Sequence, residues 1–278
     1  MLSPLTEDGW DVERAKVWDL FTPPARPSSG EVERYRELLA EFPARPSRSC
    51  LLLGCTPELR SLVHARACPL TCADKSESVF RALERLVETK GQEDFIGSDW
   101  QRLQLDTCFD IVLADGSLNM LHPCDHEAFL QLVYKALPPE GLALLRVHLL
   151  GEPQFADPHD VFAWRRVDAP HENIFTATRT HLDMLWYEEK PEKVIDFERY
   201  HERIRALHHE GGMNDEEFAA YDSLLPYNRI KLYYVEQAAF EALCDPLFTI
   251  EDVRCGKDYP CHEQHPIYAL RKRVGSGV

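Results

Sequence analysis

Long apolar runs are missing from this sequence. No stretch approaches the roughly 18 uninterrupted apolar residues that a membrane-spanning helix needs. The opening residues, MLSPLTEDGW, also lack the basic and apolar regions of a secretory signal. We therefore expect a cytoplasmic protein that does not associate with membranes.

Basic residues are scarce as well. The chain has 31 Lys and Arg against 47 Asp and Glu, which gives a formal net charge of −16. Such a surface repels phosphate backbones, and the longest basic run covers only residues 271–273. The composition therefore argues against nucleic acid as the default partner.

The nine cysteines lack the C-x-x-C spacing of a structural zinc site. Cys68 and Cys72 are four residues apart, and Cys255 and Cys261 are six apart. We therefore expect no bound metal. Several of the other cysteines lie in apolar text that is typical of buried, reduced thiols. These are Cys50, Cys55, Cys108 and Cys244.

Between residues 49 and 150 the sequence alternates short apolar runs with amphipathic stretches. The overall composition, 44% hydrophobic and 28% charged, is that of a globular protein. The alternation predicts βαβ units and a parallel sheet. Strands are predicted at residues 50–54, 70–74, 94–98, 109–115 and 142–150, and helices at residues 57–66, 78–89 and 125–137.

Two other parts flank or interrupt this region. Residues 1–47 contain two helical pieces joined by TPPARPSSG, and they predict an N-terminal helical cap. Residues 151–233 lose the alternation and predict an inserted helical lobe. The α/β pattern returns in residues 234–274, so we expect residues 48–150 and 234–274 to form one core. This last part predicts a helix at residues 235–244 and strands at 248–255 and 266–273.

The stretch SCLLLGCTPELRSL, residues 49–62, has the outline of a nucleotide-binding strand, turn and helix, but it contains a single glycine. Gly54 permits a tight turn. Thr56 is a good helix N-cap, Pro57 fits the first helical position, and Glu58 complements the positive end of the helix dipole. A carboxylate here disfavours a pyrophosphate, so the loop predicts a cofactor of another kind.

An acidic residue ends the second predicted strand. Asp74 lies 20 residues after Gly54, where a carboxylate can accept hydrogen bonds from ribose hydroxyls, although it could simply cap the helix near Ser76. Both features fit an adenosine-containing ligand without a pyrophosphate, such as S-adenosylmethionine. The spacing also suits a nicotinamide-dependent oxidoreductase, but the missing G-x-G-x-x-G motif and Glu58 argue against that class.

With these features, residues 49–150 and the two closing strands resemble a class I S-adenosylmethionine-dependent methyltransferase. The resemblance implies an α/β fold with a Rossmann-like, doubly wound, seven-stranded and mostly parallel sheet. Leu52 replaces the acidic residue that the family has two positions before its first glycine, and of three loop glycines only Gly54 is present. We therefore hypothesise that Glu58 or backbone carbonyls near Gly54 hold the amino group of the cofactor.

The resemblance also implies where the cofactor lies. In GSDW, Asp99 would meet the adenine amine and Trp100 would pack on the ring, while the loop after FDIVLAD would lie beside the methionine part. From the residues alone, Trp100 could equally belong to the core, and Ser117 and Asn119 could be turn formers. The predicted cofactor-binding residues are Gly54, Cys55, Thr56, Glu58, Asp74, Lys75, Ser98, Asp99, Trp100, Asp115, Gly116, Ser117 and Asn119.

Methyl transfer from a sulfonium is a direct displacement, in which alignment of the reacting atoms supplies much of the rate enhancement. A base is required only if the acceptor has a proton to lose. The candidate bases are His122 and His148, and each could instead be a structural histidine.

The acceptor is expected over the carboxyl ends of the strands, beneath the inserted lobe. The size of this lobe and the acidic charge favour an enclosed pocket for a small molecule. Aromatic residues at helical spacing could equally belong to a core. The predicted wall residues are Trp18, Arg26, Arg166, Trp186 and Tyr227, with Trp164 and Tyr187 as further candidates.

The sequence therefore predicts an S-adenosylmethionine-dependent methyltransferase that acts on a small molecule by direct displacement. Two alternatives remain. The incomplete glycine loop also suits a protein that binds S-adenosylmethionine as a regulator or uses it in a reaction other than methylation. A nicotinamide-dependent oxidoreductase is the second alternative.

Overall fold

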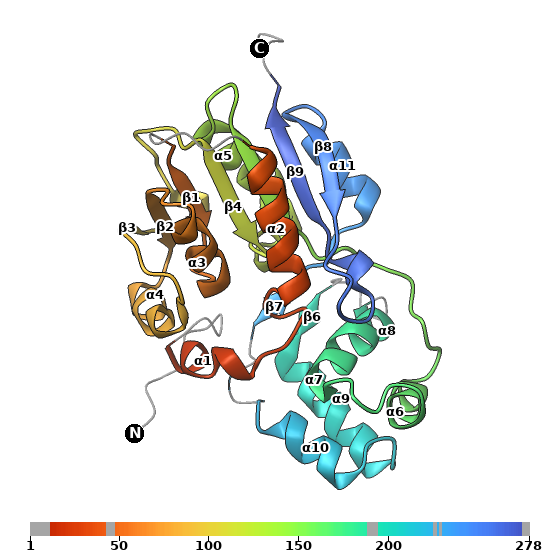
Figure 1. Cartoon of the computed structure of the whole chain (residues 1–278). Coiled ribbons are helices and arrows are strands. Elements are labelled where there is room, and N and C mark those ends of the chain that lie inside the picture. Colours follow the sequence, from red (N-terminus) through yellow and green to blue (C-terminus); the bar gives the residue numbers. More distant parts are fainter. Residues whose placement is uncertain (1–11, 43–47, 188–193, 225–226, 228–229, 274–278) are drawn as a thin grey trace.

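A seven-stranded sheet forms the centre of the protein (Figure 1). The computed structural model describes residues 12–42, 48–187, 194–224, 227 and 230–273. The strand order is β3-β2-β1-β4-β5-β9-β8, and β9 is the one strand of this sheet that runs opposite to the other six. This is the predicted Rossmann-like, mostly parallel sheet. The strands are β1 (Cys50–Leu53), β2 (Leu70–Asp74), β3 (Glu93–Gly97), β4 (Ile111–Asp115), β5 (Leu142–Arg146), β8 (Phe248–Arg254) and β9 (Ile267–Lys272).

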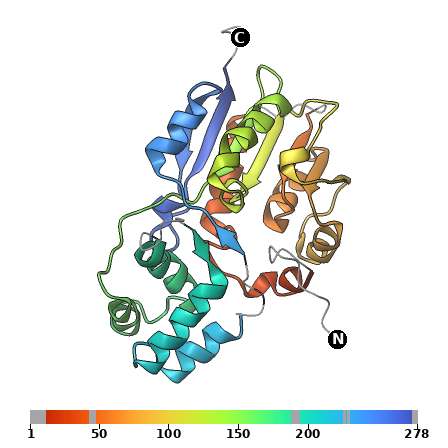
Figure 2. The ribbon, with the colours of Figure 1, turned by 180° about the vertical axis from the view of Figure 1, so that it is seen from behind.

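Helices cover both faces of the sheet, because the central strands are apolar on both sides. Alternate residues of β1 therefore point to opposite faces. Leu52 packs in the core on the side of α2 (Ser29–Glu41), α3 (Pro57–Ala65) and α4 (Glu77–Leu83). Leu51 and Leu53 face the helix layer on the other side. That layer consists of α5 (His126–Ala136) and α11 (Gln237–Cys244), and Figure 2 shows it from its own side. Leu52, which stands where the methyltransferase family has an acidic residue, is therefore part of the apolar core.

The segment predicted as an N-terminal cap lies in two different places. α2 packs on the sheet beside α3, and the hydroxyl of Tyr35 donates to the carbonyl of Ala114 at 3.0 Å. α1 (Val12–Lys16) instead contacts α4, away from the middle of the sheet. Residues 1–11, 43–47, 188–193, 225–226, 228–229 and 274 of the predicted domains lie outside the described residues.

The predicted lobe forms a third apolar core below the sheet, built from Phe162, Phe175, Phe197 and their neighbours. Its helical text matches the prediction, but a two-stranded ribbon of β6 (Ile195–Asp196) and β7 (Lys231–Leu232) was not predicted. Each ribbon strand is two residues long, which is shorter than the four to eight residues over which alternation predicts a strand. The lobe helices are α6 (Pro158–Val167), α7 (Ile174–Ala177), α8 (Asp183–Tyr187), α9 (Phe197–His209) and α10 (Asp215–Asp222), with a π-helical turn at Thr178–Leu182 between α7 and α8.

All nine cysteines are free thiols, as expected. Burial raises the pKa of the Cys50 and Cys55 thiols well above the usual range. The prediction for Cys108 was wrong: this side chain is exposed, because it precedes β4 in a surface turn. None of the described helices is long and apolar enough to cross a membrane.

Candidate functional site

One large cavity of about 500 Å³ lies where the carboxyl ends of β1, β2, β4 and β5 meet the lobe. This is the edge at which open α/β sheets bind ligands. Two of the thirteen predicted cofactor residues, Glu58 and Asn119, do not line it. The eleven that do are Gly54, Cys55, Thr56, Asp74, Lys75, Ser98, Asp99, Trp100, Asp115, Gly116 and Ser117.

The turn after β1 opens the cavity. Gly54 has a φ of +115°, a conformation that side-chain-bearing residues rarely adopt. Thr56 occupies the N-cap position and Pro57 the first helical position, as predicted. The threonine hydroxyl, however, makes no capping bond and donates instead to Asp115 Oδ2 at 3.3 Å. The expected cap is therefore used to connect β1 with β4.

Two acidic residues and a tryptophan line the part of the cavity near β2 and β3. Asp74 is buried, and its Oδ1 accepts from the backbone N–H of Ser76 at 3.1 Å, so it also supports the start of α4. Trp100 donates from Nε1 to the carbonyl of Ala73 at 2.7 Å and packs edge-on against Phe129. Asp99 precedes it and accepts from the N–H of Gln101 at 3.1 Å. These contacts fix the orientations of all three side chains.

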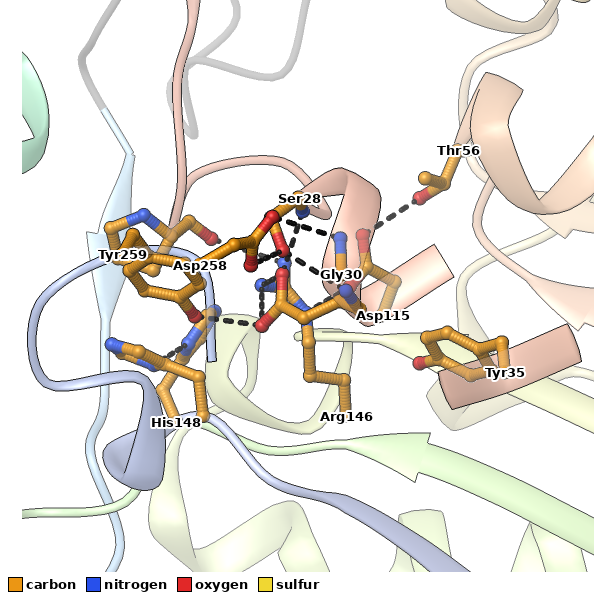
Figure 3. Close-up of polar contacts among 12 residues, drawn as sticks. Ser28, Gly30, Tyr35, Thr56, Asp115, Arg146, His148, Asp258 and Tyr259 are labelled. Carbon is orange, nitrogen blue, oxygen red and sulfur yellow. Dashed lines mark hydrogen bonds and ion pairs between the residues drawn. The ribbon is translucent and has the colours of Figure 1, made fainter. Parts of the chain in front are cut away.

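A buried ion-pair network forms the floor between β4 and β5. Arg146, at the end of β5, pairs through Nε with Asp115, and its Nη1 donates to Glu31 at 3.0 and 2.9 Å. Nη2 donates to the carbonyl of Pro24 at 3.0 Å. Figure 3 shows Arg146 between Asp115 and the start of α2. Sequence reasoning missed this residue, because Arg146 sits inside an otherwise apolar strand pattern.

Glu31 is fully buried, and it also caps α2. It accepts from the backbone N–H of Ser28 and from the hydroxyl of Tyr259, both at 2.7 Å. Burial raises the pKa of Glu31, and the charge of Arg146 opposes that shift. The N-terminal segment, the ends of β4 and β5 and the loop before β9 therefore meet at one buried charge cluster.

Glu58 lies behind the cavity wall. It forms an ion pair with Arg26, and its Oε1 accepts from Trp18 Nε1 at 3.4 Å. Burial raises the pKa of this carboxyl, although the Arg26 charge opposes the change. Its position in the first turn of α3 agrees with the sequence, but its carboxylate pairs with Arg26 and does not line the cavity.

Ser117 and Asn119 act within the protein. Ser117 lines the cavity while its hydroxyl donates to the carbonyl of Leu53 at 2.7 Å. Asn119 is fully buried; its amide donates to the carbonyls of His148 and Tyr233 at 2.8 and 2.7 Å and accepts from the N–H of His148 at 2.8 Å. The structural interpretation of Asn119 fits these contacts better than a cofactor contact.

The two candidate bases differ in exposure. His122 lies at the exposed rim of the cavity and packs edge-on against Tyr233. His148 is buried, and its Nδ1 lies 2.8 Å from Nδ1 of His265, so one ring donates to the other. Burial lowers the pKa of both rings well below the usual range, and the nearby charge of Arg146 adds to this.

Of the five predicted wall residues, only Trp18 lines the cavity. Arg166 pairs with Glu217 at 2.8 Å, and Trp186 packs in the lobe core against Tyr200. Arg26 and Tyr227 also lie outside the lining. The amphipathic helices of the lobe face its own core, so their aromatic residues were poor indicators of the cavity wall.

The N-terminal segment and the lobe supply wall residues that sequence reasoning did not single out. The available signal was the alternation in IKLYY, where Ile230 and Leu232 are buried and Lys231 is exposed. These additional wall residues are Arg14, Arg179, Ile230, Lys231, Leu232 and Tyr233. Among the described residues, no group of three or more His, Cys, Asp or Glu side chains could hold a metal ion.

No protein-family model and no curated protein matches this sequence. Solved structures match the fold. A Rhodobacter sphaeroides protein, named provisionally as a Zn-dependent alcohol dehydrogenase, has a TM-score of 0.63 at 16% identity over 98% of this chain and 100% of its own. N-methyltransferase NodS from Bradyrhizobium japonicum, in complex with S-adenosylhomocysteine, has a TM-score of 0.51 at 12% identity over 95% and 97%.

A third structure has both a methyl acceptor and a cofactor product bound. The 1,6-didemethyltoxoflavin-N1-methyltransferase of Burkholderia thailandensis, with bound 1,6-didemethyltoxoflavin and S-adenosylhomocysteine, has a TM-score of 0.52 at 14% identity and covers 99% of this chain and 94% of its own. Together with the strand order, these similarities show the class I S-adenosylmethionine-dependent methyltransferase fold.

Proposed function

We propose that the protein is a methyltransferase that transfers a methyl group from S-adenosylmethionine to a small-molecule acceptor by direct displacement. The fold is compatible with many reactions, so the argument rests on the site. The carrying observation is that Gly54, Asp74, Asp99 and Trp100, on three neighbouring strand ends, line one cavity at the edge where this fold binds ligands.

These residues suit the adenosine part of the cofactor. Asp74 can accept hydrogen bonds from ribose hydroxyls, Asp99 can accept from the adenine amine, and the Trp100 ring offers a face for stacking. The side chains are already held by hydrogen bonds to the backbone, which reduces the ordering cost of binding. The S-adenosylmethionine sulfonium supplies an electrophilic methyl group, and the chain has to align an acceptor with it.

The same region is poorly suited to a dinucleotide. Pro57 has no N–H to offer at the first position of α3, the end of the helix where a pyrophosphate would otherwise bind. Asp74 and Asp99, which line the cavity at the end of β2 and beyond the end of β3, add negative charge there. These features support a cofactor without phosphate groups.

The lobe encloses the proposed acceptor side. A cavity of about 500 Å³ is in the range of small-molecule sites. His148 is one of the buried titratable groups of the cavity wall. Because its pKa is lowered, its ring is neutral at pH 7, which is the state that a general base requires. Its role depends on whether the acceptor carries a proton that must be removed.

Calorimetric titration of the purified protein with S-adenosylhomocysteine, S-adenosylmethionine, NAD and NADP tests the cofactor. We expect both sulfur ligands to bind and both dinucleotides to fail. Asp74→Asn should weaken S-adenosylhomocysteine about tenfold by removing charged acceptors. The exposed Asp106→Asn is the matched control and should leave binding unchanged. Binding of NAD without either sulfur ligand would refute the proposal.

The reaction itself needs a separate experiment. The protein is incubated with candidate acceptors and S-adenosylmethionine labelled in the methyl group, and the products are separated. Label in the acceptor, with release of S-adenosylhomocysteine, is the expected result. Tight cofactor binding with label retained on the cofactor, or transfer of another part of the molecule, would favour the regulatory or non-methylating alternative.

A further inference from the structure

One arginine of the cavity wall has two terminal nitrogens that make no hydrogen bond among the described residues. Arg179 lies in the π-helical turn Thr178–Leu182, a kind of turn that occurs frequently at functional sites. The residue is 1% exposed and lines the cavity. Its charge also contributes to the lowered pKa of His148, after burial and the charges of His265 and Arg146, which places it near the proposed acceptor side.

The guanidinium of Arg179 is held firmly by one edge. Nε donates to Asp183 Oδ2 at 2.9 Å, and the hydroxyl of Tyr234 donates to the same oxygen at 2.9 Å. The ring of Phe197 lies 4.6 Å from the guanidinium carbon. These contacts leave the group little freedom to rotate.

The other edge of the guanidinium has no partner. Nη1 and Nη2 are buried, and neither has a hydrogen-bond partner among the described residues. Arg146 of the same cavity differs, because its Nε, Nη1 and Nη2 all donate to protein acceptors. An arginine cannot lose its charge, and a buried donor without an acceptor is costly. Such an arrangement is expected where a ligand completes the hydrogen bonds.

We propose that Nη1 and Nη2 of Arg179 bind a carboxylate group of the methyl acceptor, so that the substrates are small carboxylic acids. This inference rests on the proposed function. Two adjacent terminal nitrogens match the two oxygens of a carboxylate. Arg14 lines the same cavity and adds positive charge. A doubly charged phosphate fits less well, because Asp183 pairs with Arg179 and Asp115 pairs with the neighbouring cavity residue Arg146.

The test uses the full chain saturated with S-adenosylhomocysteine. Calorimetry measures the binding of benzoate, phenylacetate and 3-phenylpropionate, each against the primary amide of the same shape. We expect at least one acid to bind about tenfold more tightly than its amide, which is the factor for a hydrogen bond to a charged group.

The variants locate the effect. Arg179→Gln alone leaves Asp183 buried without its cation, so the double variant Arg179→Gln/Asp183→Asn is made as well. In the folded variants the preference for acid over amide should disappear while S-adenosylhomocysteine affinity stays within about twofold. Arg166→Gln, which changes a lobe arginine outside the cavity lining, should keep the preference.

The outcomes separate the two proposals. Failure of S-adenosylhomocysteine to bind the wild-type protein contradicts the proposed function. If it binds but no acid is preferred over its amide, or the double variant keeps the preference, the carboxylate site is refuted while the methyltransferase proposal stands. Acid preference in the wild type and in Arg166→Gln, with loss in the double variant, supports it.

Discussion

At the scale of single residues, Arg146 is the least expected feature of the site. A charged residue at the end of a strand usually reaches solvent, but this one is 1% exposed in its side chain and lies among two carboxylates. Burying charges is costly unless each finds a partner, and here every nitrogen does. The network connects α2 to β4 and thereby supports the cavity floor.

Removing the positive charge from this network should destabilise the fold. Arg146→Gln leaves Glu31 and Asp115 buried without their cation, so we expect a loss of about 3–5 kcal/mol in the free energy of unfolding. Urea unfolding measures it. The control is Arg81→Gln, whose exposed pair with Glu77 should contribute less than about 1 kcal/mol. Similar losses in both variants would contradict the assigned role.

The backbone of Gly116 lies close to the side chain of His148. It has a φ of +66°, and a Cβ there would lie 2.7 Å from Nε2 of His148. Gly211 has a φ of +83° with nothing within 4 Å of the added atom. Gly211→Ala should therefore cost only the backbone strain, about 1–2 kcal/mol. Gly116→Ala should cost more by urea unfolding, because His148 must also move; equal losses would show that the ring yields freely.

At the scale of elements, Asn119 connects parts that are far apart in the sequence. Its amide joins the end of β5 to the segment around β7 through backbone groups of His148 and Tyr233. The sequence does not predict this junction, because an asparagine just after a strand is equally typical of a turn.

The junction makes a specific prediction. Asn119→Ala should lower the free energy of unfolding by about 2–4 kcal/mol, since the N–H of His148 and the carbonyl of Tyr233 lose their side-chain partner. Amide hydrogen exchange should become faster at His148, whose N–H loses its acceptor. Asn214→Ala, which removes a helix cap of α10, should cost about 1 kcal/mol without changing exchange at His148. Unchanged exchange in Asn119→Ala would contradict the proposed link.

At the scale of the whole molecule, burial of histidines should make stability depend on pH. Burial lowers the pKa of His181 to about 4, and it also lowers those of His126, His148 and His265. Below the ordinary value of about 6.5 the unfolded chain binds protons that the folded chain does not. Acidification below pH 6.5 therefore favours unfolding, and the loss continues until the folded rings are protonated.

His181 gives the clearest test. Its contribution should amount to about 1 kcal/mol per pH unit between pH 6 and pH 5. His181→Asn should flatten the dependence of urea-unfolding free energy on pH by about that amount. His209→Asn, at an exposed position on α9, is the control and should keep the wild-type slope. An unaltered slope in His181→Asn would show that this ring does not resist protonation in the folded protein.

The sequence by itself determined the sheet, the helices that cover both of its faces and the edge of the sheet at which the cavity lies. These follow from local patterns: apolar runs such as Leu70–Asp74, the turn at Gly54, and acidic residues at strand ends. The tertiary structure alone decided which polar side chains face the cavity. Arg146 and Asn119, for example, are held by partners from distant segments, and such pairings leave no periodic signal in the chain.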